Sequence, residues 1–157
     1  MKILVFSDSH RALGNMYDAI AAENPDQILH LGDHYEDAED LRAAYPSIAI
    51  QYVAGNCDYA YEVPTELTLC IGGVRIFMTH GHRYWVKSDV SRLLAAAKVQ
   101  KAAIALFGHT HHPFLETIDG VTLLNPGASG YANGKAGYGR ILIENGKFTC
   151  ELMQFDS

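Results

Sequence analysis

Seven of the eight histidines stand just after segments whose hydrophobic pattern predicts β-strands. They are His10, His34, His80, His82, His109, His111 and His112. The same loops carry acids and amides, in the motifs Asp8-Ser9-His10, Gly32-Asp33, Gly55-Asn56, His80-Gly81-His82 and Gly108-His109-Thr110-His111. Core packing does not explain this placement, so we expect the five loops to converge on one edge of the fold and form a functional site.

The donor atoms in these motifs are imidazole nitrogens and carboxylate or amide oxygens, with no cysteine among the expected ligands. Such a set suits Mn²⁺, Fe, Zn²⁺, Co²⁺ or Ni²⁺ better than a closed structural zinc site. Alternate residues of an extended segment point to the same side, so Asp8 with His10, and separately His109 with His111, are expected to supply two ligands each.

The elements expected to position these loops alternate in the first part of the chain. Apolar runs predict strands at Ile3–Phe6, Gln27–Leu31 and Ile48–Ala54, and helices are expected at Ala12–Glu23 and about Glu36–Ala44. This alternation predicts an α/β fold whose site lies beyond the carboxyl ends of the strands.

The second part has a different pattern. The dipeptides Gly72-Gly73, Asp119-Gly120 and Asn145-Gly146 predict three antiparallel hairpins, because they accommodate the positive φ of tight turns. Between them, we expect a helix capped by Ser88 and a buried strand at Ala102–Phe107. Two sheets should therefore pack face to face, with helices outside.

Composition fits one globular domain over residues 1–157, since 48% of the residues are hydrophobic and 19% are charged. The net charge of −6 disfavours duplex nucleic acid and anionic bilayers as partners. The sparse cysteines Cys57, Cys70 and Cys150 favour a reducing cytoplasm, and we expect Cys70 and Cys150 in the core. The longest later apolar run, Ala102–Phe107, is too short for a membrane segment.

The five motifs, in this order, resemble those of the calcineurin-like metallophosphoesterase superfamily. The resemblance is to its small single-domain phosphodiesterase branch of bacteria and archaea, and it covers nearly the whole chain. It implies a four-layer sandwich of two mixed sheets flanked by helices. It also implies two divalent metal ions, the first held by Asp8, His10 and His111, the second by Asn56, His80 and His109, with Asp33 bridging both.

This dinuclear centre implies a metal-dependent phosphodiesterase that acts on a small phosphodiester. A hydroxide shared by two cations can attack phosphorus in line, so no protein nucleophile is required. Larger members of the superfamily have a catalytic His after Gly55-Asn56, where this chain has Cys57. A neutral thiol donates protons poorly, so His82 and His34 become candidates for the general acid. Asn56, Cys57 and His82 are thus the candidate catalytic residues.

Two alternatives follow from the same residues. His82 is expected either to act on substrate or to support the ligands, and His30, inside a strand, is expected to be a hydrogen-bonded core residue.

A protein-binding scaffold of the same fold is the alternative function, but the seven intact ligands argue for catalysis. A dinucleotide-binding fold is excluded because the first loop lacks Gly-x-Gly-x-x-Gly. The metal, the natural substrate and the oligomeric state, a homo-oligomer included, stay open.

Overall fold

The computed structural model describes residues 1–59, 62–130 and 136–155. Ten strands form two sheets, and the described helices are α1 (Leu13–Glu23), α2 (Tyr35–Ala44), the 3₁₀ turn η1 (His82–Tyr84) and α3 (Ser91–Val99). The strands are β1 (Lys2–Phe6), β2 (Gln27–His30), β3 (Ala49–Tyr52), β4 (Glu66–Ile71), β5 (Val74–Thr79), β6 (Ile104–Leu106), β7 (Phe114–Ile118), β8 (Val121–Asn125), β9 (Gly137–Glu144) and β10 (Lys147–Gln154).

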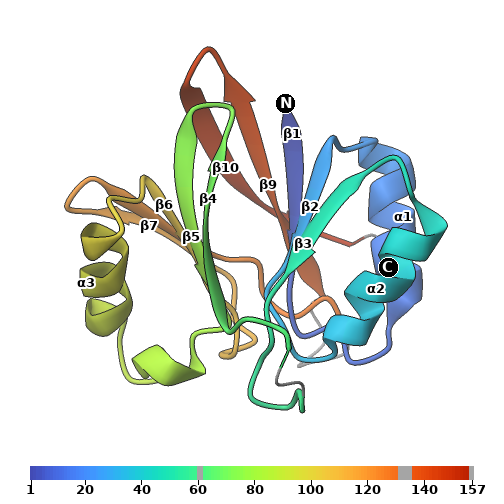
Figure 1. The fold of residues 1–157 in the computed structure, drawn as a ribbon, viewed down its shortest axis with the longest axis horizontal. Helices are drawn as coiled ribbons and strands as arrows, with labels where there is room; N and C mark the ends of the chain where they lie inside the picture. The colour runs from blue at the N-terminus through green and yellow to red at the C-terminus, as the bar shows by residue number, and fades with distance from the viewer. Residues whose placement is uncertain (60–61, 131–135, 156–157) are drawn as a thin grey trace.

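Each sheet combines a parallel centre with antiparallel hairpins. The first has the strand order β10-β9-β1-β2-β3, with β1, β2 and β3 parallel. The second has the order β4-β5-β6-β8-β7, with β5, β6 and β8 parallel. The three predicted hairpins are confirmed as β4–β5, β7–β8 and β9–β10. In Figure 1 the loops that leave β1, β2, β5 and β6 lie at the lower side of the sandwich.

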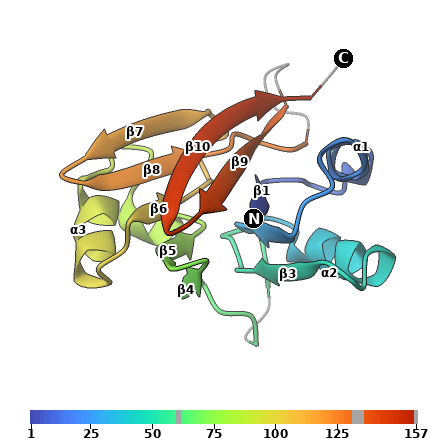
Figure 2. The same cartoon turned by 90° about the horizontal axis from the view of Figure 1, so that it is seen from above.

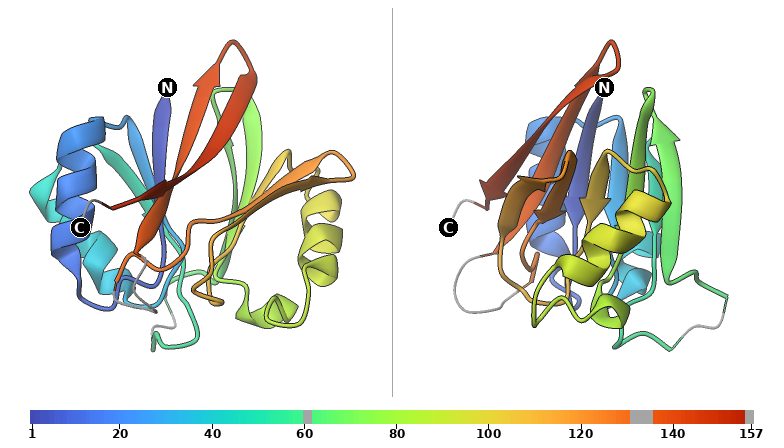
Figure 3. Two further views of the ribbon diagram at one scale, coloured as in Figure 1. Left: turned by 180° about the vertical axis from the view of Figure 1, so that it is seen from behind. Right: turned by 90° about the vertical axis from the view of Figure 1, so that its left-hand side faces the viewer.

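The two sheets pack face to face and the helices cover their outer faces, as predicted (Figures 2 and 3). Residues such as Val5 and Leu29 of the first sheet share a buried core with Ile76 and Leu106 of the second. A second cluster lies under α1 and α2, and a third lies under α3. Each sheet is therefore packed on both faces, and this packing holds the ends of its strands in place.

Some expectations were wrong in detail. The third helix begins at Ser91 rather than after Ser88, and its N-cap residue, Val90, makes no side-chain cap. Cys70 is exposed rather than in the core, because it lies on β4, an edge strand of the second sheet, between Leu69 and Ile71, which pack on the central core. Cys150 is half-buried against the central core, as expected. No helix among the described residues is long and apolar enough to cross a membrane.

Candidate metal centre

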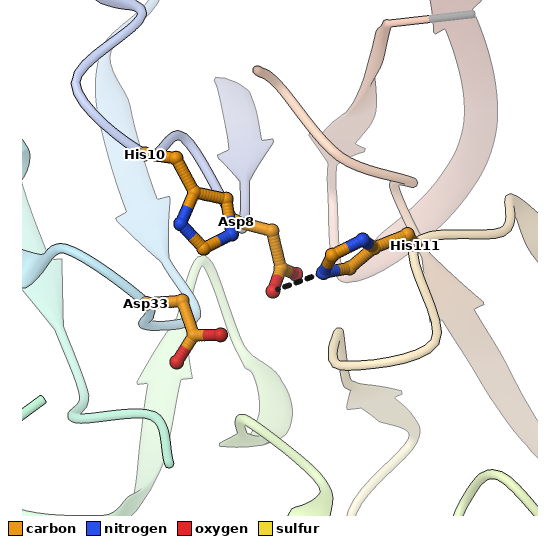
Figure 4. A group of neighbouring side chains, drawn as sticks. All are labelled: Asp8, His10, Asp33 and His111. Carbon is orange, nitrogen blue, oxygen red and sulfur yellow. Dashed lines mark hydrogen bonds and ion pairs between the residues drawn. The ribbon is translucent and has the colours of Figure 1, made fainter. Parts of the chain in front are cut away.

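Four side chains from three loops form a compact cluster of potential metal ligands. One donor atom from each of Asp8, His10, Asp33 and His111 lies within 4.8 Å of the other three (Figure 4). Asp8 and Asp33 are almost fully buried, and Nε2 of His111 lies 3.1 Å from Oδ1 of Asp8. Two buried carboxylates facing imidazoles in this way form a pocket suited to a divalent cation.

His80 adds a fifth side chain to the same place. Its Nδ1–H donates to the carbonyl of Leu31 at 2.9 Å, which turns Nε2 towards the two carboxylates. Nε2 is buried without a hydrogen-bond partner among the described residues, 3.5 Å from Oδ2 of Asp33 and 3.8 Å from Oδ1 of Asp8. A buried ring nitrogen that faces two carboxylates at these distances, with no hydrogen bond to either, is satisfied by a cation between them, so these residues fit a metal ion.

His109 and Asn56 lie on the other side of His80. Nδ1 of His109 is 3.0 Å from Oδ1 of Asn56, and the rings of His109 and His80 are 5.1 Å apart. Burial, reinforced by the neighbouring His80, lowers the pKa of His109 to about 4, which keeps this imidazole available as a ligand. The predicted ligands thus fall into two adjoining groups, with Asp33 beside both.

The backbone of this site departs from the extended conformation expected for its motifs. Five of the seven predicted ligands have positive φ, at 54° for Asp8, 44° for His10, 58° for Asp33, 70° for His109 and 65° for His111. Asp8 and His10 lie in one cluster, as predicted, but not through an extended segment, and His109 does not pair with His111. His109 faces Asn56 while His111 faces Asp8, because left-handed residues turn the chain between them. Such conformations persist only where surrounding contacts impose them.

Glycines allow the motif loops to approach closely. A Cβ on Gly55 would lie 2.2 Å from Oδ1 of Asp33, and one on Gly108 would lie 2.1 Å from Oγ of Ser7. Any side chain at these two positions would push the loops apart. The two glycines therefore bring the carboxylates of Asp33 and Asp8 within reach of the histidine loops.

Asp58 holds the second and third motifs together, a role that was not predicted. Its carboxylate accepts N–H bonds from Gly55 and His34 at 2.8 Å, and from Asp33 at 2.9 Å. A longer bond comes from Tyr35, the first residue of α2, where a negative charge also interacts favourably with the helix dipole. The available signal was an acid two residues after Asn56, in the loop that contains Gly55.

A buried chain of hydrogen bonds joins the first two motifs. Ser9 donates its hydroxyl to Asp37 at 2.7 Å, so Nε2–H of His30 must be the donor in its 2.9 Å bond to Ser9. Nδ1 of His30 accepts the N–H of Gly32 at 3.1 Å. Burial lowers the pKa of His30 to about 4, so the ring is neutral. His30 is thus a fully hydrogen-bonded core residue, as expected.

The candidate proton donors surround the cluster. Cys57 donates its backbone N–H to Oδ1 of Asp33 at 2.9 Å, and desolvation together with the nearby Asp33 charge raises the pKa of its exposed thiol. The ring of His82 lies 5.5 Å from that of His80, and its buried Nδ1 has no hydrogen-bond partner in the part of the chain that the structure describes. Nδ1 of His34 lies 3.1 Å from Nδ1 of His10.

With this geometry established, comparison with known proteins shows the family. The calcineurin-like phosphoesterase superfamily domain matches residues 1–146, and the chain belongs to that superfamily. The probable metallophosphoesterase YsnB of Bacillus subtilis is 32% identical over 132 residues, which cover 82% of this chain and 75% of YsnB. A phosphodiesterase of Methanocaldococcus jannaschii is 30% identical over 157 aligned residues, covering 85% of this chain and 88% of that protein.

Solved structures share the fold. A Streptococcus pneumoniae protein described as a predicted phosphoesterase superimposes with a TM-score of 0.79 at 27% identity, covering 95% of this chain and 86% of that one. Vps29 of Entamoeba histolytica, solved in complex with zinc, gives a TM-score of 0.77 at 21% identity, with 99% and 100% coverage. At that identity the likeness to Vps29 concerns the fold alone.

Proposed function

We propose that this protein is a metal-dependent phosphodiesterase with a dinuclear centre. The observation that carries the proposal is the buried, unpartnered Nε2 of His80 directed at Asp33 and Asp8. The first ion would be held by Asp8, His10 and His111, and the second by Asn56, His80 and His109. Asp33, which adjoins both groups, would bridge them. The family membership and the named phosphodiesterase relative support the same activity.

The chemistry divides between the ions and the protein. Two divalent ions held by these residues would supply Lewis-acid charge and activate a water for attack on phosphorus. The protein positions the ligands: Leu31 fixes the tautomer of His80, and Cys57 orients Asp33 through its N–H. Burial alone would raise the pKa of Asp33, but His80 and that N–H outweigh it and lower the pKa, so the bridging group stays ionised.

The surrounding charges favour diesters over monoesters. A monoester dianion needs cationic side chains to hold its additional charge in a productive pose. Arg11 is one of two arginines near the motifs, but its guanidinium lies 3.0 Å from Asp37 and 3.3 Å from Asp40, which already compensate its charge. Arg83, exposed after His82, and Lys87, near enough to His109 to lower its pKa, remain as cations beside the motifs. A diester monoanion requires less compensation.

A paired substrate assay tests the proposal. The metal-free protein is reconstituted with Mn²⁺ or Ni²⁺ and assayed with bis(p-nitrophenyl) phosphate and p-nitrophenyl phosphate. We expect the higher kcat/KM for the diester, loss of activity with chelator, and recovery when metal is returned. A kcat/KM for the monoester more than about tenfold higher would refute the diester preference. Hydrolysis no faster than in metal-only controls would instead support the protein-binding scaffold alternative.

A further inference from the structure

A pocket of about 720 Å³ lies beside the candidate metal centre. Its walls are largely apolar, with Val86, Val90, Phe107, Pro113 and Phe114 among the lining residues. The rings of Phe107 and Phe114 meet edge to face at 5.7 Å. Pockets of this volume with aromatic walls are typical of sites for small organic groups.

The pocket adjoins two histidine motifs along the chain. A Cβ placed on Gly81, between His80 and His82, would lie 3.0 Å from Cγ2 of Val86 and 3.4 Å from Cβ of Phe107. Two wall residues therefore contact the backbone of the loop after β5. The opposite wall includes Thr110, which lies between His109 and His111. The pocket is thus lined by residues of the same two loops that supply four of the predicted histidines.

The polar groups of the pocket are fixed or lie at its rim. Oγ1 of Thr110 accepts a hydrogen bond from Asn125 at 2.9 Å and another from the N–H of His112 at 3.1 Å. Lys87 is exposed and makes no ion pair with any residue in the described ranges. Glu116 is exposed on the opposite side of the pocket, on β7. The interior is therefore apolar and the entrance is polar.

We propose that this pocket binds an aromatic ester group of the phosphodiester substrate. The inference rests on the proposed function and deepens it by naming the substrate class: a diester with at least one aryl or heteroaryl ester group. When the phosphoryl group lies at the metal centre, its two ester groups must leave in different directions. One of them can enter between the loops after β5 and β6, where the edge-to-face rings of Phe107 and Phe114 offer an aromatic wall.

Two substrates with the same leaving group test this. Phenyl p-nitrophenyl phosphate and methyl p-nitrophenyl phosphate both release nitrophenolate, so their difference reports the retained ester group. For the Mn²⁺-loaded protein we expect a kcat/KM at least about tenfold higher for the phenyl ester, because burying an aromatic ring in the pocket stabilises the bound substrate more than burying a methyl group does. Equal values for the two active substrates would overturn the pocket assignment while leaving the phosphodiesterase proposal intact.

A matched pair of variants locates the effect. Val90→Phe fills the pocket and should reduce the phenyl-to-methyl ratio to near one. Val99→Phe makes the same change at the far end of α3, where Val99 is 78% exposed and outside the pocket, and should leave the ratio unchanged. An unchanged ratio in a folded Val90→Phe protein would contradict the proposal.

A binding measurement separates this proposal from the proposed activity. Trp85, the one tryptophan of the chain, directly precedes Val86 of the pocket wall, so its fluorescence can report occupancy. We expect diphenyl phosphate to change that fluorescence saturably in the wild type and the Val99→Phe protein, and dimethyl phosphate to bind at least about tenfold more weakly. Equal binding of the two compounds overturns the pocket. Absent hydrolysis with selective diphenyl phosphate binding would overturn only the phosphodiesterase proposal.

Discussion

Nε2 of His80 lies 3.5 Å from Oδ2 of Asp33, and these two residues belong to loops from different sheets. His80 follows β5 of the second sheet, and Asp33 follows β2 of the first. A cation between them would link the sheets at the carboxyl ends of their strands. Metal binding should therefore stabilise the folded protein as well as provide catalytic charge.

Asp33→Asn should damage activity more than His111→Ala. The amide oxygen can still accept the N–H of Cys57, so the substitution mainly removes a negative charge shared by both ions. His111 is a neutral ligand whose side chain is one-third exposed, so water can replace it. Diester hydrolysis and metal content are measured for both variants at the same Mn²⁺ concentration. Equal residual activity at equal metal content would show that Asp33 does not bridge.

Asp58→Ala should weaken both stability and metal retention. The substitution leaves the N–H groups of Gly55, Asp33 and His34 without their carboxylate acceptor, at a cost of about 1–3 kcal/mol in the free energy of unfolding. Asp18→Ala is the matched control, because Asp18 is exposed on α1 and makes no hydrogen bond within the described part of the chain. Denaturant unfolding and elemental analysis measure the two effects. Indistinguishable results for the two variants would rule out the positioning role of Asp58.

His30→Gln should make stability less dependent on acid pH. Because folding lowers the pKa of His30 from 6.5 to about 4, the unfolded chain binds a proton in this interval that the folded chain excludes. The stability due to neutral His30 is fully present above pH 6.5 and is lost as the pH falls towards 4, at up to about 1.4 kcal/mol per pH unit.

The test measures the free energy of unfolding of the metal-free wild type and the metal-free His30→Gln variant between pH 7 and pH 4. The His30→Gln variant should be less stable at pH 7, because the N–H of Gly32 loses its acceptor, but its stability should fall less steeply with acid. His109, whose pKa is also lowered, is present in both proteins and cancels in the comparison. Parallel curves would show that His30 is not the buried neutral group.

Cys57→His should increase hydrolysis of diesters with poor leaving groups. The raised pKa of the thiol keeps it protonated and makes it a weak acid, whereas an imidazolium can protonate the departing oxygen. General acid catalysis contributes a factor of about 100 to 10,000 when the geometry is accurate, so an unrefined substitution should give a modest gain. Rates are compared for alkyl and nitrophenyl leaving groups. An unaltered dependence on leaving-group pKa would mean that residue 57 does not face the substrate.

The architecture was predictable because its signals are local. Ile3–Phe6 reads as a strand buried on both faces, and β1 is packed between the central core and α1. The turn residues Gly73, Asp119 and Asn145 have the positive φ that their hairpins require. In each case the residue types favour the observed conformation, so the local sequence pattern is enough to identify the strand or the turn.

The interior of the site was less predictable because its conformation depends on distant partners. Asp and His adopt a left-handed backbone more often than most residues, but only a small minority of them do, so the residue types of Asp8 and His111 alone do not predict it. The bonds between Asp58 and Asp33 and between Ser9 and His30 join residues at least 21 positions apart. Cys70 was misplaced because edge position in a sheet depends on strand order, which hydrophobicity alone does not reveal.

The central claim is that two metal ions at this cluster catalyse phosphodiester hydrolysis. It is tested most directly by titrating metal-free protein with Mn²⁺ while following the initial rate of bis(p-nitrophenyl) phosphate hydrolysis. Two ions acting together predict a rate that rises to a plateau at about two equivalents per chain. Full activity at one equivalent would contradict the dinuclear centre, and absence of hydrolysis at every ratio would contradict the enzymatic function.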